Sequence, residues 1–102
     1  MNDSYKLNMS SDLLKEAIDS SAIIPPGQKR VLKTICSYSY PISAKEIEDE
    51  LQISRPSTNF ALQQLLKRNF IIRIKDSIFL YKENIERLEE LKLRYIEKCA
   101  KK

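Results

Sequence analysis

The sequence predicts a mainly α-helical domain with one small β-hairpin, and three observations carry this prediction. Apolar residues recur at helical spacing in several separate segments of the chain. One pair of β-branched and aromatic runs flanks the dipeptide Asp76-Ser77, which is the pattern of a hairpin with a tight turn. The chain has 102 residues, which is enough for one domain with a modest core.

The N-terminal part is expected to hold two helices. Ser11 or Asp12 can cap the first helix, since both side chains accept hydrogen bonds from backbone amides. The apolar face of this helix is formed by Leu13, Leu14, Ala17 and Ile18. The run 24–27 contains two consecutive prolines and is expected to break the chain. A second helix is predicted over residues 28–37, with an inner face of Val31, Leu32, Ile35 and Cys36.

A short helix is predicted to begin after Ser43. Ser43 and Glu46 have the spacing of a capping box, in which each side chain bonds the backbone amide of the other residue. The helix that follows is expected to bury Ile47 and Leu51 and to end near Gln52.

A longer helix is predicted to follow almost at once. Ser54 can cap it, and Pro56 is tolerated in its first turn. The helix is expected to run to about Arg68. Asn69 then occupies the position after the last helical turn, where the backbone commonly adopts a left-handed conformation. Asn accepts that conformation better than other non-glycine residues.

The C-terminal third is expected to contain the hairpin and a long helix. The strands are predicted over residues 70–75 and 78–81, and Asn84 can cap a helix that continues to about Ala100. The apolar stripe of this helix can simply cover the domain. We expect it instead to pair with a second copy of the chain, which makes the protein a homodimer. The interface predicted in this way consists of Ile85, Leu88, Leu91, Tyr95, Ile96 and Cys99.

A short helix, a tight turn, a longer helix and a hairpin in this order resemble the winged helix-turn-helix superfamily. The residues that carry the resemblance are the run Ser43 to Ile47, the turn Gln52 to Ser54, and the run Pro56 to Ile71 with its leucines at 62, 65 and 66. The charged C-terminal helix makes the chain similar to small MarR-type and PadR-type transcription regulators. The resemblance implies an arm with a short helix over 1–27, a winged helix-turn-helix domain over 28–82, and a dimerisation helix over 83–102.

The basic charge of the protein is concentrated on the segment that such a fold would present to DNA. Residues 54–82 contain six basic residues and one acidic residue, a net charge of +5, whereas the rest contains twelve basic and thirteen acidic residues. Helical spacing places polar side chains opposite the apolar face of the longer helix, and amide side chains there match adenine edges in the major groove. The predicted DNA-binding residues are Arg55, Ser57, Asn59, Phe60, Gln63, Gln64, Lys67, Arg73 and Lys75.

Phe60 is the one large apolar residue on that polar face. We expect its ring to contact a thymine methyl group in the major groove. Two alternatives remain open from the sequence: Phe60 belongs to the core, or it contacts a protein partner.

The composition excludes several classes of function. The sequence has no His and one Gly, which excludes His-based catalysis and metal sites as well as glycine-rich phosphate loops. Two cysteines are too few for a structural zinc site, and the longest apolar run, Ile78 to Tyr81, is too short to span a membrane. We therefore expect a protein that is not an enzyme and that holds no cofactor and no metal ion. We expect it to be a cytoplasmic regulator that binds double-stranded DNA. The alternative is a winged-helix module that binds proteins within a larger assembly without reading bases.

Overall fold

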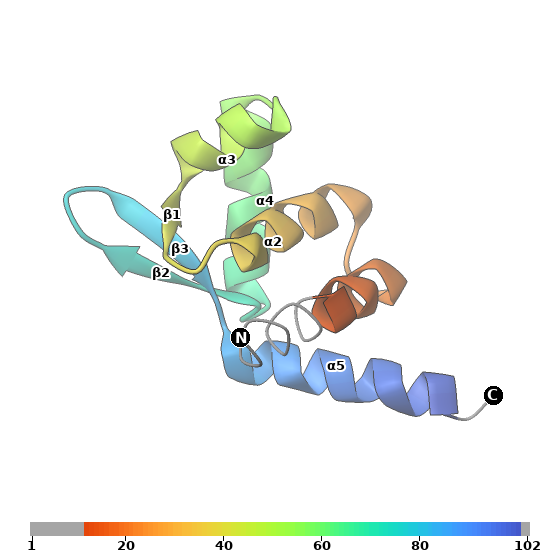
Figure 1. The fold of residues 1–102 in the computed structure, drawn as a ribbon. Helices are drawn as coiled ribbons and strands as arrows, with labels where there is room; N and C mark the ends of the chain where they lie inside the picture. The colour runs from red at the N-terminus through yellow and green to blue at the C-terminus, as the bar shows by residue number, and fades with distance from the viewer. Residues whose placement is uncertain (1–11, 101–102) are drawn as a thin grey trace.

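The structure is a computed structural model that describes residues 12–100 (Figure 1). Residues 12–20 are helical, and this helix is followed in chain order by α2 (Pro26–Ser37), β1 (Ile42–Ser43), α3 (Ala44–Leu51), α4 (Arg55–Lys67), β2 (Ile71–Lys75), β3 (Phe79–Glu83) and α5 (Ile85–Ala100). The prediction of a mainly helical chain with a small hairpin is confirmed. Ser11, one of the two residues predicted to cap the first helix, lies outside the described residues.

Helix α2 begins two residues earlier than the sequence predicted. Pro25 is the N-cap, with an extended backbone at φ −63° and ψ 154°, and Pro26 is the first helical residue. Proline suits this position because its fixed φ is already helical and its missing N–H would have no partner there. The double proline therefore marks the start of the helix rather than a gap before it.

Helices α3 and α4 begin with the caps that the sequence predicted. The Glu46 amide donates to the Ser43 hydroxyl at 3.2 Å, and the Ser43 amide donates to the Glu46 carboxylate at 2.9 Å. The Ser57 amide donates to the Ser54 hydroxyl at 3.2 Å. Between the two helices, Gln52 adopts a left-handed conformation with φ 55°, which lets the chain turn within three residues.

The end of α4 is a Schellman motif centred on Asn69, which has φ 65° as predicted. The Asn69 amide donates to the Leu66 carbonyl and the Phe70 amide to the Leu65 carbonyl, both at 3.0 Å. These bonds hold Phe70 against the last turn of α4, and β2 starts only after it. The prediction that Phe70 begins the strand is wrong for this reason.

The sheet has three strands in the order β1-β3-β2, all antiparallel. The sequence predicted two strands and missed β1, in which Ile42 pairs with Tyr81 and Ser43 with Leu80. Strand β3 also starts and ends later than predicted, because its pairing with β2 begins at Phe79 and continues through residues 82 and 83. Pairing on both edges makes β3 the centre of the sheet, and it places the β2–β3 hairpin so that it projects away from the helices (Figure 1).

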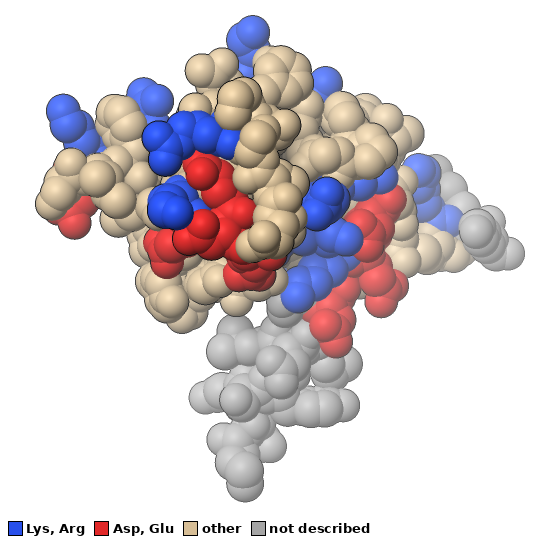
Figure 2. All heavy atoms as spheres, turned by 90° about the horizontal axis from the view of Figure 1, so that it is seen from above, with Lys and Arg blue, Asp and Glu red and all other residues tan. Residues whose placement is uncertain are grey.

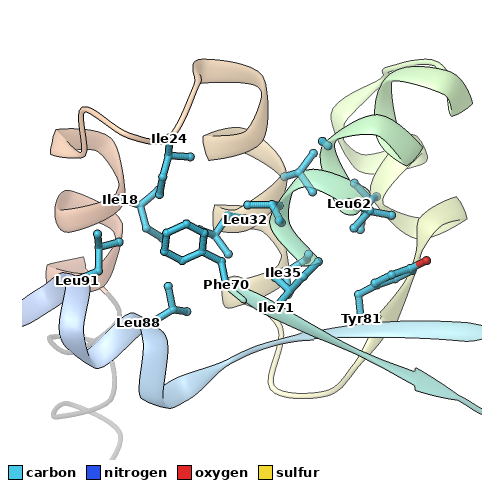
Figure 3. Packing of buried hydrophobic residues seen from close by; sticks show 14 of the residues in the cluster. Ile18, Ile24, Leu32, Ile35, Leu62, Phe70, Ile71, Tyr81, Leu88 and Leu91 are labelled. Carbon is cyan, nitrogen blue, oxygen red and sulfur yellow. The ribbon is translucent and has the colours of Figure 1, made fainter. Parts of the chain in front are cut away.

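Phe70 lies at the centre of the core and is fully buried. Figure 3 shows its ring between Ile18 of the first helix, Leu32 of α2 and Leu88 of α5. The core thus connects segments from both ends of the described chain. The Arg87 guanidinium lies over the same ring, 4.5 Å from its centroid, which is a cation–π contact.

Helix α5 contributes part of its apolar surface to this core. Leu88 and Leu91 are 2% and 8% exposed, and Tyr95 is half-buried, with its hydroxyl donating to Glu16 at 2.9 Å. Leu88 and Leu91 were both predicted to face a second chain, but both belong to the chain's own core. Leu88 points toward Phe70 and Leu91 lies beside the first helix, so little of their surface remains for a partner (Figure 3). The residues of α5 left exposed include Ile85, Leu93, Ile96 and Cys99.

Candidate nucleic-acid interface

Helix α4 has one buried and one exposed face, as its sequence predicted. Thr58, Ala61, Leu62 and Leu65 are buried against the core. The predicted DNA-binding residues of this helix that are exposed are Arg55, Ser57, Asn59, Phe60, Gln63 and Lys67, and Gln64 is half-buried at the edge. Because no other element of the described chain covers this face, its amide and hydroxyl groups are available to a ligand.

Phe60 is exposed over 61% of its surface, and it lies on the same face as Gln63 and Lys67. This exposure excludes the alternative in which Phe60 belongs to the core. The ring is therefore accessible to another molecule. Two alternatives remain for the molecule that the Phe60 ring contacts: a DNA base and a protein partner.

The cations of segment 54–82 are not all free. The Arg55 Nε atom lies 3.3 Å from a Glu48 carboxylate oxygen, and Lys82 forms a 3.3 Å ion pair with Glu83. The Arg68 guanidinium donates to the carbonyl of Ile23. Within residues 12–100, Lys67 and Lys75 form no ion pair. The charge available to a nucleic acid is therefore smaller than the sequence count of +5.

Acidic side chains of α3 lie beside the N-terminal end of α4. Figure 2 looks down on the molecule from above and shows an acidic group near the middle of this face, with Lys and Arg side chains in separate groups around it. Helix α3 contains Glu46, Glu48, Asp49 and Glu50. Since an acidic surface repels phosphates, the surface of α3 is unsuited to a nucleic acid, and the candidate interface does not include it.

The β2–β3 hairpin carries the two other predicted DNA-binding residues, Arg73 and Lys75. Both side chains are exposed and follow alternate positions of β2, so they share one face of the hairpin. The Arg73 guanidinium lies 4.3 Å from the centroid of the Phe79 ring, which restricts its orientation. The hairpin also exposes apolar side chains on both faces, namely Ile72, Ile74, Ile78 and Phe79.

The titratable groups with shifted pKa values lie away from α4 and the hairpin tip. Burial raises the pKa of the Cys36 thiol to about 12, and a hydrogen bond to Glu50 raises the pKa of Tyr38 to about 12. A hydrogen bond to Glu16 raises the pKa of Tyr95 to about 12. Each shift favours the neutral form, which gives these groups no role as a base or a nucleophile near neutral pH.

Among residues 12–100, no group of three His, Cys, Asp or Glu side chains is arranged to hold a metal ion. The helices of this part of the chain are all too short or too polar to cross a membrane.

The structure also shows a groove that the sequence did not predict. It lies between the N-terminus of α2 and the first half of α4, has a volume of about 410 Å³, and shares Ser57 and Phe60 with the exposed face of α4. Two sequence features could have indicated it: Gly27, the single glycine of the chain, and Gln28, a polar residue at a core-facing position.

The fold is shared with solved structures of several other proteins. A protein from the thermoacidophilic archaeon Sulfolobus tokodaii superimposes with a TM-score of 0.61 at 18% identity, covering 93% of this chain and 95% of that chain. MarR from E. coli, in its oxidized form, gives a TM-score of 0.58 at 22% identity, and the superposition covers 85% of this chain and 68% of MarR. A transcriptional regulator from Thermotoga maritima gives a TM-score of 0.58 at 16% identity, and the superposition covers 98% of this chain and 77% of that regulator.

Comparison of sequences alone places the chain in no family. No family model matches the sequence. No curated protein matches it either. At these levels of identity the structural likeness establishes the fold. The chain has the winged-helix fold of MarR-like transcription regulators.

Proposed function

We propose that the protein is a non-catalytic transcription regulator that binds double-stranded DNA in a sequence-dependent way. Helix α4 would lie in the major groove, and the β2–β3 hairpin would contact the flanking backbone as a wing. The observation that carries the proposal is the exposed face of α4, on which Asn59 and Gln63 present amide groups with no other element of the described chain above them. Structural likeness to transcription regulators supports the same function.

The contacts would divide between affinity and base choice. Lys67, Arg73 and Lys75 are exposed cations suited to phosphates, which supply affinity but carry no sequence information. Asn59 and Gln63 suit adenine, because a carboxamide offers one donor and one acceptor to the N7 and N6 positions of that base. Phe60 lies between them along the helix and would pack on a thymine methyl group.

The test measures binding of the purified full chain to duplex DNA. A selection from random duplexes is expected to enrich one sequence, and Asn59→Ala or Gln63→Ala is expected to relax the preference at one base pair, by about 1–3 kcal/mol. Lys67→Gln is the matched control, since loss of a phosphate contact weakens binding to all sequences alike. Enrichment of no sequence would refute sequence-dependent binding, and absence of binding to random duplex at low salt would refute DNA binding altogether.

We also propose that the protein acts as a homodimer through α5. The part of α5 left outside the core carries Ile85, Leu93, Ile96 and Cys99, and these apolar side chains are exposed along one side of the helix. Pairing two copies of this side would bury them and would set two α4 helices about 34 Å apart, one turn of DNA. This interface is narrower than the stripe expected from the sequence, because Leu88 and Leu91 are already in the core.

Sedimentation of the full chain tests the dimer. A species of twice 11.9 kDa is expected at micromolar concentration, and Ile96→Glu is expected to convert it to the monomer. Glu97→Gln, on the same helix, serves as the control and should leave the dimer intact. A wild-type protein that sediments only as the monomer would contradict this part of the proposal.

The alternative, a module that binds another protein, is favoured by the apolar surface of the hairpin. Ile72, Ile74, Ile78 and Phe79 are all exposed on this short hairpin, and apolar surface gathered in one part of a protein often marks a protein interface. The duplex-binding experiment separates the two functions. A chain of this second kind would show no sequence preference, and its residual affinity for DNA would not depend on Asn59 or Gln63.

A further inference from the structure

The groove between α2 and α4 opens beside the proposed DNA-reading face. Its apolar wall is formed by Pro25, Val31, Ile53, Phe60 and Ala61, and its polar lining includes Gly27, Gln28, Arg30 and Ser57. Because Ser57 and Phe60 belong both to this groove and to the exposed face of α4, a ligand that covers that face passes the mouth of the groove.

The N-terminus of α2 leaves backbone donors at this groove. The first amides of a helix have no acceptor within the helix, and the N-cap side chain commonly accepts one of them. Here the N-cap is Pro25, which has no side-chain acceptor, and Pro26 has no N–H. Within residues 12–100, the amides of Gly27 and Gln28 have no hydrogen-bond acceptor, whereas the Lys29 amide donates to the Pro25 carbonyl at 2.9 Å. The helix dipole adds partial positive charge at the same end.

Gly27 is a second feature, besides the unpaired amides, that points to a ligand at this groove. It is the single glycine of the chain, and a Cβ atom built on it would meet no atom within 4 Å. Its φ is not positive, so neither the backbone conformation nor internal packing requires glycine there. Glycine in a helix is less favourable than alanine, and a glycine without an internal reason is typical of a place where a ligand approaches the backbone closely.

Gln28 and Arg30 add polar groups from side chains. Gln28 is 7% exposed, and its Oε1 atom is buried without a hydrogen-bond partner, which is costly unless a water or a ligand completes the site. Because Oε1 is an acceptor, Gln28 suits an anion only after a half-turn of its amide group, which places the NH₂ donor at this position. The Arg30 Nη2 atom donates to the Leu51 carbonyl at 3.4 Å, which anchors one side of the guanidinium and leaves its other N–H groups available.

We propose that this groove holds a phosphate of the DNA backbone that flanks the major groove. The donors would be the amides of Gly27 and Gln28 and the guanidinium of Arg30, with Ser57 at the opposite wall. The site would fix the rotation of α4 about its own axis in the major groove, because a second helix, α2, would then contact the DNA backbone beside it. This inference rests on the proposed function and extends it to a part of the chain outside the residues predicted from sequence.

The test compares binding of a random-sequence duplex at several salt concentrations between the wild type and three variants of the full chain. Arg30→Gln is expected to reduce the slope of log K against log salt by about one and to weaken binding about tenfold at low salt. Lys29→Gln is the matched control: it removes the same charge one residue away, from a side chain that donates to the Asp19 carbonyl outside the groove. Gly27→Ala is expected to weaken binding several-fold without lowering the melting temperature, since alanine favours the helix.

Glycine-selective ¹⁵N labelling gives a direct readout, because the chain has one glycine and hence one backbone signal of this type. The Gly27 signal is expected to shift when duplex is added in phosphate-free buffer. If it shifts with millimolar inorganic phosphate but not with duplex, the groove is a small-anion site and the proposal is wrong. If the wild type binds duplex and Arg30→Gln behaves as Lys29→Gln does, this inference fails while the proposed function stands. Absence of duplex binding by the wild type would refute both.

Discussion

Two phenylalanines ten residues apart provide a quantitative test of the interface. Phe60 is 61% exposed, whereas Phe70 is fully buried. Complete burial of such a side chain stabilises a protein by about 1.5–3 kcal/mol, so the hidden part of Phe60 contributes about 1 kcal/mol. Alanine has the better helix propensity, by roughly 0.5 kcal/mol, which leaves a net cost for Phe60→Ala of about 0.5 kcal/mol. Phe70→Ala should cost about 3–5 kcal/mol, because it also leaves a cavity.

Thermal unfolding followed by circular dichroism measures this difference. At about 4–8 °C per kcal/mol, Phe60→Ala should lower the melting temperature by less than about 5 °C and Phe70→Ala by more than about 12 °C. The same Phe60→Ala protein should bind its selected duplex more weakly. Replacing thymine by uracil in that duplex, which removes the methyl group, should weaken the wild type but not the variant. Equal losses of stability for the two variants would refute the assignment of Phe60 to an exposed contact face.

Three further predictions concern local features of the fold. Ser43→Ala removes the hydroxyl that accepts from the Glu46 amide and should lower the free energy of unfolding by about 1 kcal/mol, measured by urea denaturation. Asn69→Ala should cost about 1 kcal/mol because of its positive φ, whereas Asn69→Gly should match or exceed the wild type; equal stability of both variants would contradict the left-handed assignment. A thiol reagent at pH 8 should modify Cys99 quickly and Cys36 slowly in the native protein, since the pKa of Cys36 is raised to about 12 and Cys99 is exposed; equal rates in the folded state would argue against that burial.

The parts of the fold that could be predicted are those set by neighbouring residues. Ser43 with Glu46 and Ser54 with Ser57 form their bonds within three residues, and the left-handed Asn69 ends α4 through bonds to the preceding turn. Such hydrogen bonds depend on local sequence, so the pattern of residues is sufficient to identify them. The exposed face of α4 was predictable for a related reason, since helical periodicity separates its polar from its apolar side chains.

The parts that could not be predicted depend on partners distant in the sequence. Strand β1 consists of two residues, and only its pairing with β3 makes it a strand. Periodicity showed that α5 has an apolar side but could not show what covers it. Leu88 and Leu91 are covered by a core that includes Ala17 and Ile18 of the first helix, some seventy residues away. The groove at Gly27 was missed because it exists only where α2 meets α4.

The charge available to DNA also depends on contacts between residues distant in the sequence, and this dependence leads to a last prediction. The sequence places six cations between residues 54 and 82, and if all met phosphates the slope of log K against log salt would be about −5 per protomer. In the structure, Arg55 and Lys82 lie beside carboxylates and Arg68 is bonded to a carbonyl oxygen. Releasing them would leave Glu48 and Glu83 near the DNA, which offsets the gain.

The slope should therefore reflect Lys67, Arg73 and Lys75, together with Arg30 of the groove, and should be about −3 to −4 per protomer. Binding of a random duplex between low and moderate salt, followed by fluorescence anisotropy, measures it. Glu48→Gln is the informative variant, because it frees Arg55 from its ion pair and should make the slope steeper by up to about one. A wild-type slope near −5 that Glu48→Gln does not change would mean that the ion pairs open on DNA, and the restricted interface derived from them would be wrong.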